Sequence, residues 1–357
     1  MKRRIRKVRR LLAHHKIDAL LVSHPPNIRY LTGFTSSNAY LVVTASGRSV
    51  FLTDGRYIEA AQKSVEADAV ELIEKDGLKS IAGALKGQGV RRLGFESEHV
   101  SHARAVKLIE TLGARKCKPV SGVVESVRAI KEPEEVAAIR KAVRLAEGAF
   151  RHVVPLLRPG VRERDIAVEL EFYFMAGGGD QAAFDPLVAF GPHSSVPHHS
   201  TGRRKLRETD VVLIDWGVRV GGYSSDLTRT LLPPRMRRRT KAVYQVVLEA
   251  QGAALERVRS GTRLSAPDKA ARQVMEAASY GRHFTHSLGH GLGLEVHEQP
   301  GLTRGAEGTL RAGMVVTVEP GIYLPGQFGV RIEDDVLVTA GGHEVLSGLP
   351  KRARSWG

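Results

Sequence analysis

The sequence contains a single cysteine, and it has no hydrophobic run that could cross a membrane. Cys117 has no partner for an intramolecular disulfide, and one thiol cannot build a zinc site of the cysteine type. A bilayer span needs about 20 consecutive apolar residues, which the sequence does not contain. The basic N-terminus is not followed by the apolar stretch of a signal peptide. We therefore expect a cytoplasmic protein with reduced thiols and no membrane partner.

Three common catalytic signatures are also missing. There is no Gly-x-Ser-x-Gly elbow for a serine nucleophile and no Gly-rich phosphate loop that ends in Lys-Ser or Lys-Thr. His297-Glu298 is not followed by the second histidine of the zinc-protease helix. These absences argue against serine hydrolases of that type, P-loop nucleotide hydrolases and zincins.

Acidic residues are scarce relative to basic ones. The chain has 54 Lys and Arg against 38 Asp and Glu, a formal net charge of +16. A balance this basic raises the question of nucleic acid binding. The basic run at 2–10, however, carries a helical apolar stripe of Ile5, Val8, Leu11 and Leu12, which indicates a packed helix with a solvated basic face. Without zinc-finger spacing or an RNA-binding aromatic motif, we expect no nucleic acid partner.

The length of 357 residues, 42% of them hydrophobic, fits two domains. Residues 1–125 alternate strand-like and helix-like segments, which predicts an α/β domain. We expect strands at 18–22, 40–44 and 49–53, and helices at 57–67 and 78–86. In the second domain, 126–357, Pro133 with its acidic neighbours predicts a helix start. A second helix is predicted over 165–175, and short strands with glycine turns are expected for most of the remainder.

Two strand-and-turn patterns place acids at the ends of apolar strands. Residues 211–214 lead into Asp215, and a turn at Gly221-Gly222 would bring Asp226 onto a diagonal position of the same face. Downstream, an apolar strand over 314–318 ends in Glu319, and glycines punctuate a return that reaches Glu333.

Carboxylates in such positions are costly unless they are paired or coordinated. Arg229 and Arg331 could neutralise some of them, whereas two divalent cations would balance all four. For any single acid, an arginine pair or an exposed position is the commoner explanation. For the four acids taken together, the segment that contains His286, His290 and His297 among glycines favours cation binding over these explanations. Imidazole together with carboxylates suits Mn²⁺, Co²⁺, Fe²⁺ or Zn²⁺.

These motifs resemble the proline-peptidase branch of the pita-bread (M24) metallopeptidases, over nearly the whole chain. Residues 27–35 and 52–57 resemble the family's creatinase-like N-terminal domain, and 184–189 with Pro197-His198 resembles its substrate loop. The acidic strands and the Gly-His-Gly-Leu-Gly segment resemble its metal frame. The resemblance implies an α/β creatinase-like N-terminal domain and an α+β pita-bread catalytic domain.

The resemblance also implies a role for each site residue. The expected ligands of two divalent cations, with Mn²⁺ or Co²⁺ ahead of Zn²⁺ or Fe²⁺, are Asp215, Asp226, His290, Glu319 and Glu333. Glu319 would also accept the proton of the attacking water. His198 and His297 would donate hydrogen bonds to the substrate carbonyl and the oxyanion, and Arg331 would orient the carboxylates. The implied substrate is a peptide with proline at the second position, and the implied assembly is a homodimer.

One departure from the family bears on substrate length. Dipeptidases of the family commonly carry an arginine directly after His-Glu-x-Pro, where it reads the free carboxylate of a C-terminal proline. This chain has Gly301 there, with Arg304 nearby. The missing arginine favours an Xaa-Pro aminopeptidase over an Xaa-Pro dipeptidase. A non-catalytic pita-bread binding protein is the third alternative, and the complete ligand set argues against it.

Four further residues are expected to shape the pocket. An apolar wall for the proline ring is expected from Phe184 and Tyr323. His193 stands where the family often has asparagine, and Trp216 where it often has phenylalanine or tyrosine. Both replacements are expected to reshape the pocket rather than to abolish the chemistry.

Overall fold

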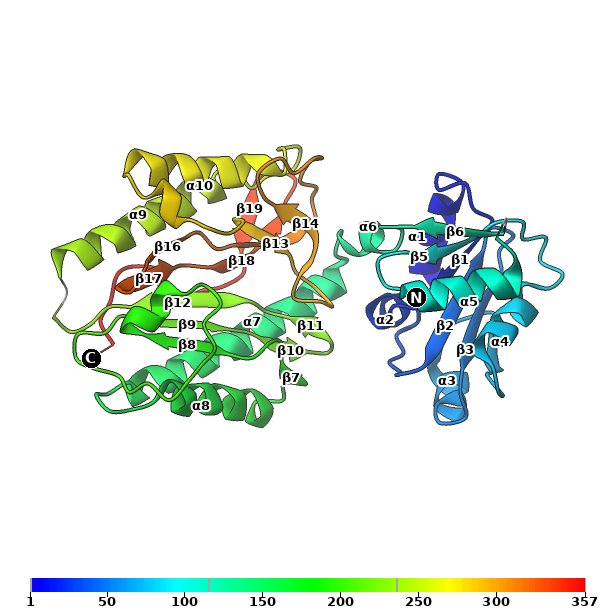
Figure 1. Ribbon diagram of the computed structural model, residues 1–357, viewed down its shortest axis with the longest axis horizontal. Helices are drawn as coiled ribbons and strands as arrows, with labels where there is room; N and C mark the ends of the chain where they lie inside the picture. Colours follow the sequence, from blue (N-terminus) through cyan, green and yellow to red (C-terminus); the bar gives the residue numbers. More distant parts are fainter. Residues whose placement is uncertain (1, 115, 236, 357) are drawn as a thin grey trace. The chain divides into compact units, whose positions relative to one another are not determined.

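The computed structural model describes residues 2–114, 116–235 and 237–356 (Figure 1). Its contacts divide the chain into two compact units, Met1–Arg128 and Ala129–Gly357. The division at 125/126 expected from the sequence stays a prediction, and its outer limits, residues 1 and 357, lie outside the described residues. Within the described part of the chain, no helix is both long and apolar enough to span a membrane.

The first unit is built on a six-stranded mixed sheet in the order β4-β3-β2-β1-β5-β6. Antiparallel pairing joins β1 to β2 and β2 to β3, whereas the other neighbours are parallel. The three predicted strands are confirmed as β1, β2 and β3. The bounds are β1 (Ala19–Val22), β2 (Ala39–Thr44), β3 (Ser49–Thr53), β4 (Ala69–Leu72), β5 (Leu93–Glu96) and β6 (Cys117–Val120).

The helices of this unit follow the sequence pattern closely. The two predicted helices are confirmed as α3 and α4, and the N-terminal stripe forms α1 with Ile5, Val8 and Leu12 buried. The bounds are α1 (Lys2–Leu12), α2 (Pro25–Thr32), α3 (Ile58–Ser64), α4 (Gly77–Leu85), α5 (His102–Leu112) and α6 (Glu125–Arg128). Together with the mixed sheet, they confirm the predicted α/β class.

The second unit opens with α7 (Pro133–Val153) and α8 (Glu163–Ala176), both near their predicted positions. Proline occupies the first turn of α7, where its missing N–H costs nothing. The side chain of Glu135 accepts a hydrogen bond from the backbone N of Glu132 at 2.9 Å, which caps the helix start. The helix α8 ends before Gly177, as the glycine run predicts.

The strands of the second unit form several small sheets, in the orders β11-β10-β7, β12-β9-β8, β14-β13-β15-β18-β19 and β16-β17. Their bounds are β7 (Gln181–Ala182), β8 (Leu187–Phe190), β9 (Val212–Trp216), β10 (Val218–Val220), β11 (Tyr223–Ser224), β12 (Leu227–Leu231), β13 (Gly289–Gly291), β14 (Glu298–Leu302), β15 (Val315–Val318), β16 (Gly321–Leu324), β17 (Phe328–Arg331), β18 (Asp334–Val338) and β19 (His343–Val345).

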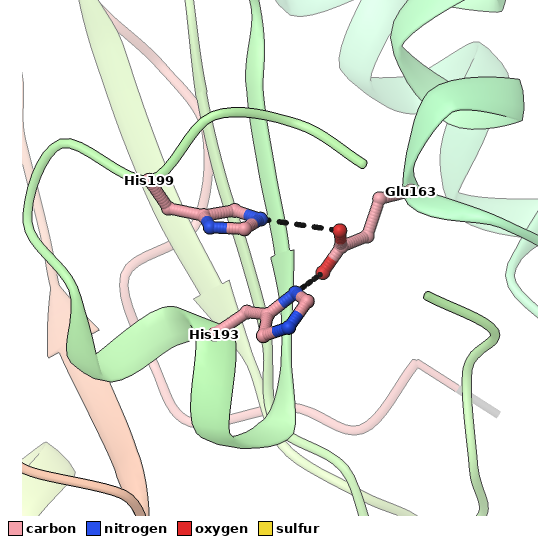
Figure 2. A group of neighbouring side chains, drawn as sticks. All are labelled: Glu163, His193 and His199. Atoms are coloured by element: carbon pink, nitrogen blue, oxygen red, sulfur yellow. Dashed lines mark hydrogen bonds and ion pairs between the residues drawn. The ribbon is translucent and has the colours of Figure 1, made fainter. Parts of the chain in front are cut away.

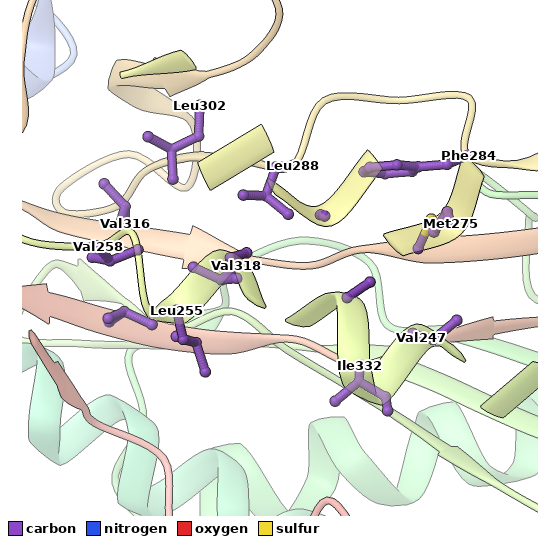
Figure 3. Close-up of a cluster of buried hydrophobic side chains, with 14 of the residues drawn as sticks. Val247, Leu255, Val258, Met275, Phe284, Leu288, Leu302, Val316, Val318 and Ile332 are labelled. Atoms are coloured by element: carbon purple, nitrogen blue, oxygen red, sulfur yellow. The ribbon is translucent and has the colours of Figure 1, made fainter. Parts of the chain in front are cut away.

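Two helices interrupt the region in which mostly strands were expected, so that expectation was wrong for 238–277. The helices are α9 (Arg238–Leu255) and α10 (Ser265–Ala277). The buried face of α9 includes Val243, Val247, Ala250 and Ala254, which recur at helical spacing. Arginines at the start and small residues at the end obscure this stripe in the sequence. Figure 3 shows the core that α9 and α10 form with the strands.

The helices α7 and α8 cover the other side of the strands from α9 and α10 (Figure 1). Trp216 of β9 lies fully buried in this second core. Its ring stacks on Phe150 with centroids 4.7 Å apart, and its Nε1 donates to the carbonyl of Ala146 at 2.8 Å. Trp216 therefore anchors α7 to the strand that carries Asp215.

Truncation of this anchor should destabilise the second unit. We expect Trp216→Ala to lower the free energy of unfolding by about 3–5 kcal/mol, because it removes a fully buried indole and leaves a cavity. The matched control is Phe172→Ala on α8, whose side chain is 67% exposed; it should change stability by less than about 0.5 kcal/mol. Urea unfolding followed by far-UV circular dichroism measures both, and equal effects of the two substitutions would contradict the packing argument.

Candidate metal centre and active-site cleft

The first pair of acids comes from β9 and the start of β12. The register pairs Asp215 with Thr228, which lies two residues beyond Asp226. The two aspartates are therefore diagonal neighbours, as the sequence predicts. Gly221 and Gly222 form the expected turn with φ of +58° and +83°, which favours glycine at both positions.

The second pair of acids meets at the end of two antiparallel strands, β15 and β18. Val318 pairs with Asp334, so Glu319 and Glu333 flank the same end of the ladder. The expectation that 330–333 forms the return strand of β15 was wrong. Residues 321–331 instead form a separate hairpin, β16–β17, and the strand that returns to β15 begins only at Asp334.

His290 reaches these acids from β13, which pairs with β15. Its Nε2 lies 3.4 Å from Oε1 of Glu319 and 3.7 Å from Oδ2 of Asp226. Its Nδ1 donates to the carbonyl of Gly291 at 3.1 Å, which directs Nε2 to the acids. A Cβ at Gly289 would lie 2.0 Å from a carbonyl oxygen of β15. Glycine is therefore required for the strand to approach so closely.

The five predicted ligands line one cleft with a volume of about 460 Å³. One ligand atom from each of Asp226, His290 and Glu333 lies within 4.8 Å of the others. The side chains that line the cleft are Phe184, Asp185, Leu187, Pro197, His198, His199, Asp215, Asp226, His286, Ser287, His290, Val296, His297, Glu319, Arg331 and Glu333. The structure thus brings together every predicted ligand, and their coordination of metal stays a prediction.

Burial and mutual repulsion dominate the electrostatics of the cleft. Burial, followed by the neighbouring carboxylates, raises the pKa of Asp226 and of Glu333 well above the ordinary values. Burial also raises the pKa of Asp215, although Arg331 opposes the shift. For Glu319 burial acts in the same direction, but the hydrogen bond and charge of His290 outweigh it and lower the pKa.

The cleft offers the donors that a divalent cation requires. Oδ1 of Asp215 is buried without a hydrogen-bond partner among the described residues, whereas its Oδ2 accepts from Arg331 at 2.5 Å. Arg229, the other cation proposed to offset the acids, instead pairs with Asp334 at 2.7 Å. The negative charges in the cleft therefore exceed the guanidinium charge there. An imidazole and carboxylates with spare lone pairs fit hard to borderline divalent cations.

The predicted catalytic side chains lie in the same cleft. His198 and His297 line it, and the rings of His297 and His290 are 4.2 Å apart. Besides Asp215, Arg331 donates to the hydroxyls of Thr228 and Tyr323, at 3.0 and 2.8 Å. This fork fixes Asp215 relative to β12, which is the geometry that an orienting role requires.

Of the four residues expected to shape the pocket, the structure places one on the wall of the cleft and three elsewhere. Phe184 lines the cleft. Tyr323 is buried, and its hydroxyl is shared between Arg331 and His286, so its polar group serves the hydrogen-bond network. Trp216 packs in the core described above and His193 binds Glu163, and neither is among the residues that line the cleft.

Sequence reasoning missed three residues that support the ligands. Thr228 donates to Glu333 at 2.6 Å, Thr317 donates to Glu319 at 3.3 Å, and Asp335 accepts from the backbone N of Asp226 at 3.1 Å. The alternation of Thr317 with Glu319 and the acidic run at 333–335 were available signals. The contact of Thr228, by contrast, depends on strand pairing between distant segments.

The fold and the cleft define a metal-dependent hydrolase, and comparison with known proteins specifies the kind. Residues 137–340 match metallopeptidase family M24, and residues 4–130 match the creatinase/prolidase N-terminal domain. The chain belongs to family M24 and is a metal-dependent peptidase of the pita-bread fold, as the sequence predicts.

Several relatives resemble this chain along its whole length. The Xaa-Pro dipeptidase of Pyrococcus horikoshii is 33% identical, with 97% of each chain covered. Among solved structures, an Xaa-Pro dipeptidase from Bacillus anthracis superposes with a TM-score of 0.95 at 35% identity, covering 99% of both chains. An X-Pro aminopeptidase from Thermotoga maritima gives 0.89 at 32% identity, covering 98% of this chain and 99% of that one.

The close packing of the acids leads to a prediction about the effect of metal on the thermal stability of the protein. We expect Mn²⁺ at about 100 times its dissociation constant to raise the melting temperature of the metal-free protein by about 5–10 °C, because the ion binds only the folded site. Asp226→Asn should lose most of this increase, while the exposed control Glu249→Gln should keep it. Differential scanning calorimetry with and without chelator measures the shift, and an unchanged shift in Asp226→Asn would contradict the proposed ligand set.

Proposed function

We propose that this peptidase is an Xaa-Pro dipeptidase that uses two divalent cations. The observation that carries the proposal is the convergence of four acids and His290 in one cleft of a chain whose full-length relatives include Xaa-Pro dipeptidases. These relatives favour the dipeptidase over the aminopeptidase that the sequence favoured. We further propose Mn²⁺ or Co²⁺ as the native metal, a homodimer as the assembly, and the cytoplasm as the location, with no nucleic acid partner.

Different residues of the chain would bind the cations, transfer the proton and stabilise the developing negative charge. The cations, held by Asp215, Asp226, His290, Glu319 and Glu333, would supply the Lewis acidity that activates water and polarises the scissile carbonyl. Glu319 would accept a proton from the attacking water and pass it to the leaving nitrogen as the C–N bond breaks. His198 and His297 would donate hydrogen bonds to the carbonyl oxygen as negative charge develops on it.

Proline accounts for the need for a specialised enzyme. The Xaa-Pro bond is a tertiary amide without an N–H, so backbone-type recognition of the leaving side fails. The leaving group is a secondary amine that must gain a proton before it departs. A carboxylate beside the scissile bond meets this requirement, and Phe184 offers an apolar surface for the ring.

An Xaa-Pro aminopeptidase is the second candidate, and one local observation favours it. Gly301, in β14, offers no side chain to bind a substrate carboxylate. Arg304 is 67% exposed, lies 3.8 Å from Glu276, and is not among the residues that line the cleft. The similarity to the Thermotoga maritima aminopeptidase also agrees with this alternative.

Substrate length distinguishes the two candidates. We expect an Xaa-Pro dipeptide to be hydrolysed with a higher kcat/KM than an Xaa-Pro tripeptide or longer peptide, because the relatives named as dipeptidases share the full-length architecture. Dialysis against a chelator should abolish the activity, and Mn²⁺ should restore it. An amino acid release assay over the three substrates measures the ratio. Preference for the longer peptides would reverse the assignment in favour of an aminopeptidase.

The proposed oxyanion donor can be tested separately. We expect His198→Ala to lower kcat by about 100-fold with little change in KM, because the hydrogen bond strengthens only as charge develops. The manganese content, measured by mass spectrometry, should stay at the wild-type value. A large rise in KM at unchanged kcat would instead assign His198 to substrate binding.

A further inference from the structure

Glu163, at the start of α8, is a buried carboxylate that the proposed reaction does not use. Its side chain is 0% exposed, and both of its oxygens accept N–H donors (Figure 2). Oε1 accepts from the backbone N of Phe190 at 2.9 Å and from Nδ1 of His193 at 2.8 Å. Oε2 accepts from Nε2 of His199 and from the backbone N of Gly202, each at 3.1 Å.

All four donors come from one segment, 190–202, and this segment carries His198 to the cleft. His198 is exposed and makes no hydrogen bond to the described residues. Its position therefore depends on the backbone that holds it. The same segment is also bound to the strand β17, where the backbone N of Gly329 donates to the hydroxyl of Ser194 at 2.9 Å. The segment is thus fixed between the carboxylate of Glu163 and β17.

We propose that Glu163 is a positioning residue that holds His198 in place through His199 and His193. An ionised carboxylate only accepts hydrogen bonds, so it selects the ring tautomers that present N–H at these two nitrogens. Hydrogen bonds to a charged acceptor are stronger than neutral ones, and a buried carboxylate deprived of them is costly. This inference rests on the proposed function, because it assigns Glu163 to the placement of the oxyanion donor.

The same three side chains also form a donor set that zinc could use. Ligand atoms of Glu163, His193 and His199 lie within 4.8 Å of one another. Hydrogen bonds already occupy both oxygens of the carboxylate, however, and account for the ring nitrogens that face it. The observed geometry therefore favours positioning, and zinc binding becomes an outcome of the test.

The substitution Glu163→Gln tests the proposal with little change in size. An amide replaces one acceptor oxygen with an NH₂ donor, which would then face N–H groups. We expect kcat for an Xaa-Pro dipeptide to fall by about tenfold or more, with KM within about twofold, because a displaced hydrogen-bond donor weakens only the transition state. The manganese content should be unchanged.

A double-mutant cycle separates positioning from general structural support. In the His198→Ala background, Glu163→Gln should cost less than about twofold, because the residue that Glu163 positions is already absent. The matched control is Glu169→Gln on the same helix, where Glu169 pairs with His152 at 3.0 Å on the surface. This control should keep the wild-type kcat.

A second variant covers the case in which Glu163→Gln does not fold. His193→Leu removes one donor and leaves three, and it should lower kcat by about threefold or more in wild type but not in the His198→Ala background. His193→Gln, which retains a donor, should restore the rate. Circular dichroism shows whether Glu163→Gln is folded. If it is not folded, His193→Leu takes its place in the double-mutant cycle.

Three results would overturn the proposal. The first is a wild-type kcat in Glu163→Gln or, where that variant does not fold, in His193→Leu. The second is a loss of equal size in the wild-type and His198→Ala backgrounds. The third is one additional Zn²⁺ bound by the manganese-loaded wild type and absent from His193→Leu, which would make the cluster a metal site. If wild type cleaves no dipeptide, the proposed function fails by itself, and the same cycle is then measured on an Xaa-Pro tripeptide.

Discussion

Repulsion among buried carboxylates is the constraint around which the second unit is arranged. Asp226 and Glu333 are nearly inaccessible to water, and burial together with the charges of neighbouring carboxylates raises the pKa of each. The protein offsets part of this repulsion with Arg331 and with the hydroxyl of Thr228. The divalent cations proposed above would neutralise the remainder, so that metal binding and the stability of this unit would be coupled.

The strands and helices supply the rigidity that such a site requires. The acids sit at the ends of two strand ladders, and helix pairs cover the strands on both sides. The histidines proposed to contact the substrate, His198 and His297, are placed differently, on connecting segments beside the ladders. His297 precedes Glu298, whose carboxylate pairs with the buried amine of Lys131 at 2.7 Å. A buried carboxylate with close polar partners thus supports the segment next to His297, as Glu163 does for the segment next to His198.

The sequence predicts the local part of this arrangement and misses the part that depends on tertiary contacts. Apolar strands that end in Asp215 and Glu319 are visible in the sequence, as is the glycine turn that sets the diagonal with Asp226. The separate β16–β17 hairpin is not visible in the sequence, because its glycines are equally compatible with a direct return of the chain to β15. The pairing of Arg229 with Asp334 is also not visible in the sequence, because the two residues belong to distant strands that come together only in the folded chain.

The glycines that flank His290 have a consequence for redesign of the site. A side chain at Gly289 or Gly291 would meet a backbone carbonyl oxygen of a neighbouring strand at 2.0 or 2.2 Å, which no rotamer change can relieve. Neither glycine of β13 can therefore be replaced. Natural variation and laboratory evolution are confined here to the residues before Gly289 and after Gly291. Changes in the ion preference of the proposed metal site would then come from the acids and their hydroxyl partners, where side chains rather than main chain form the contacts.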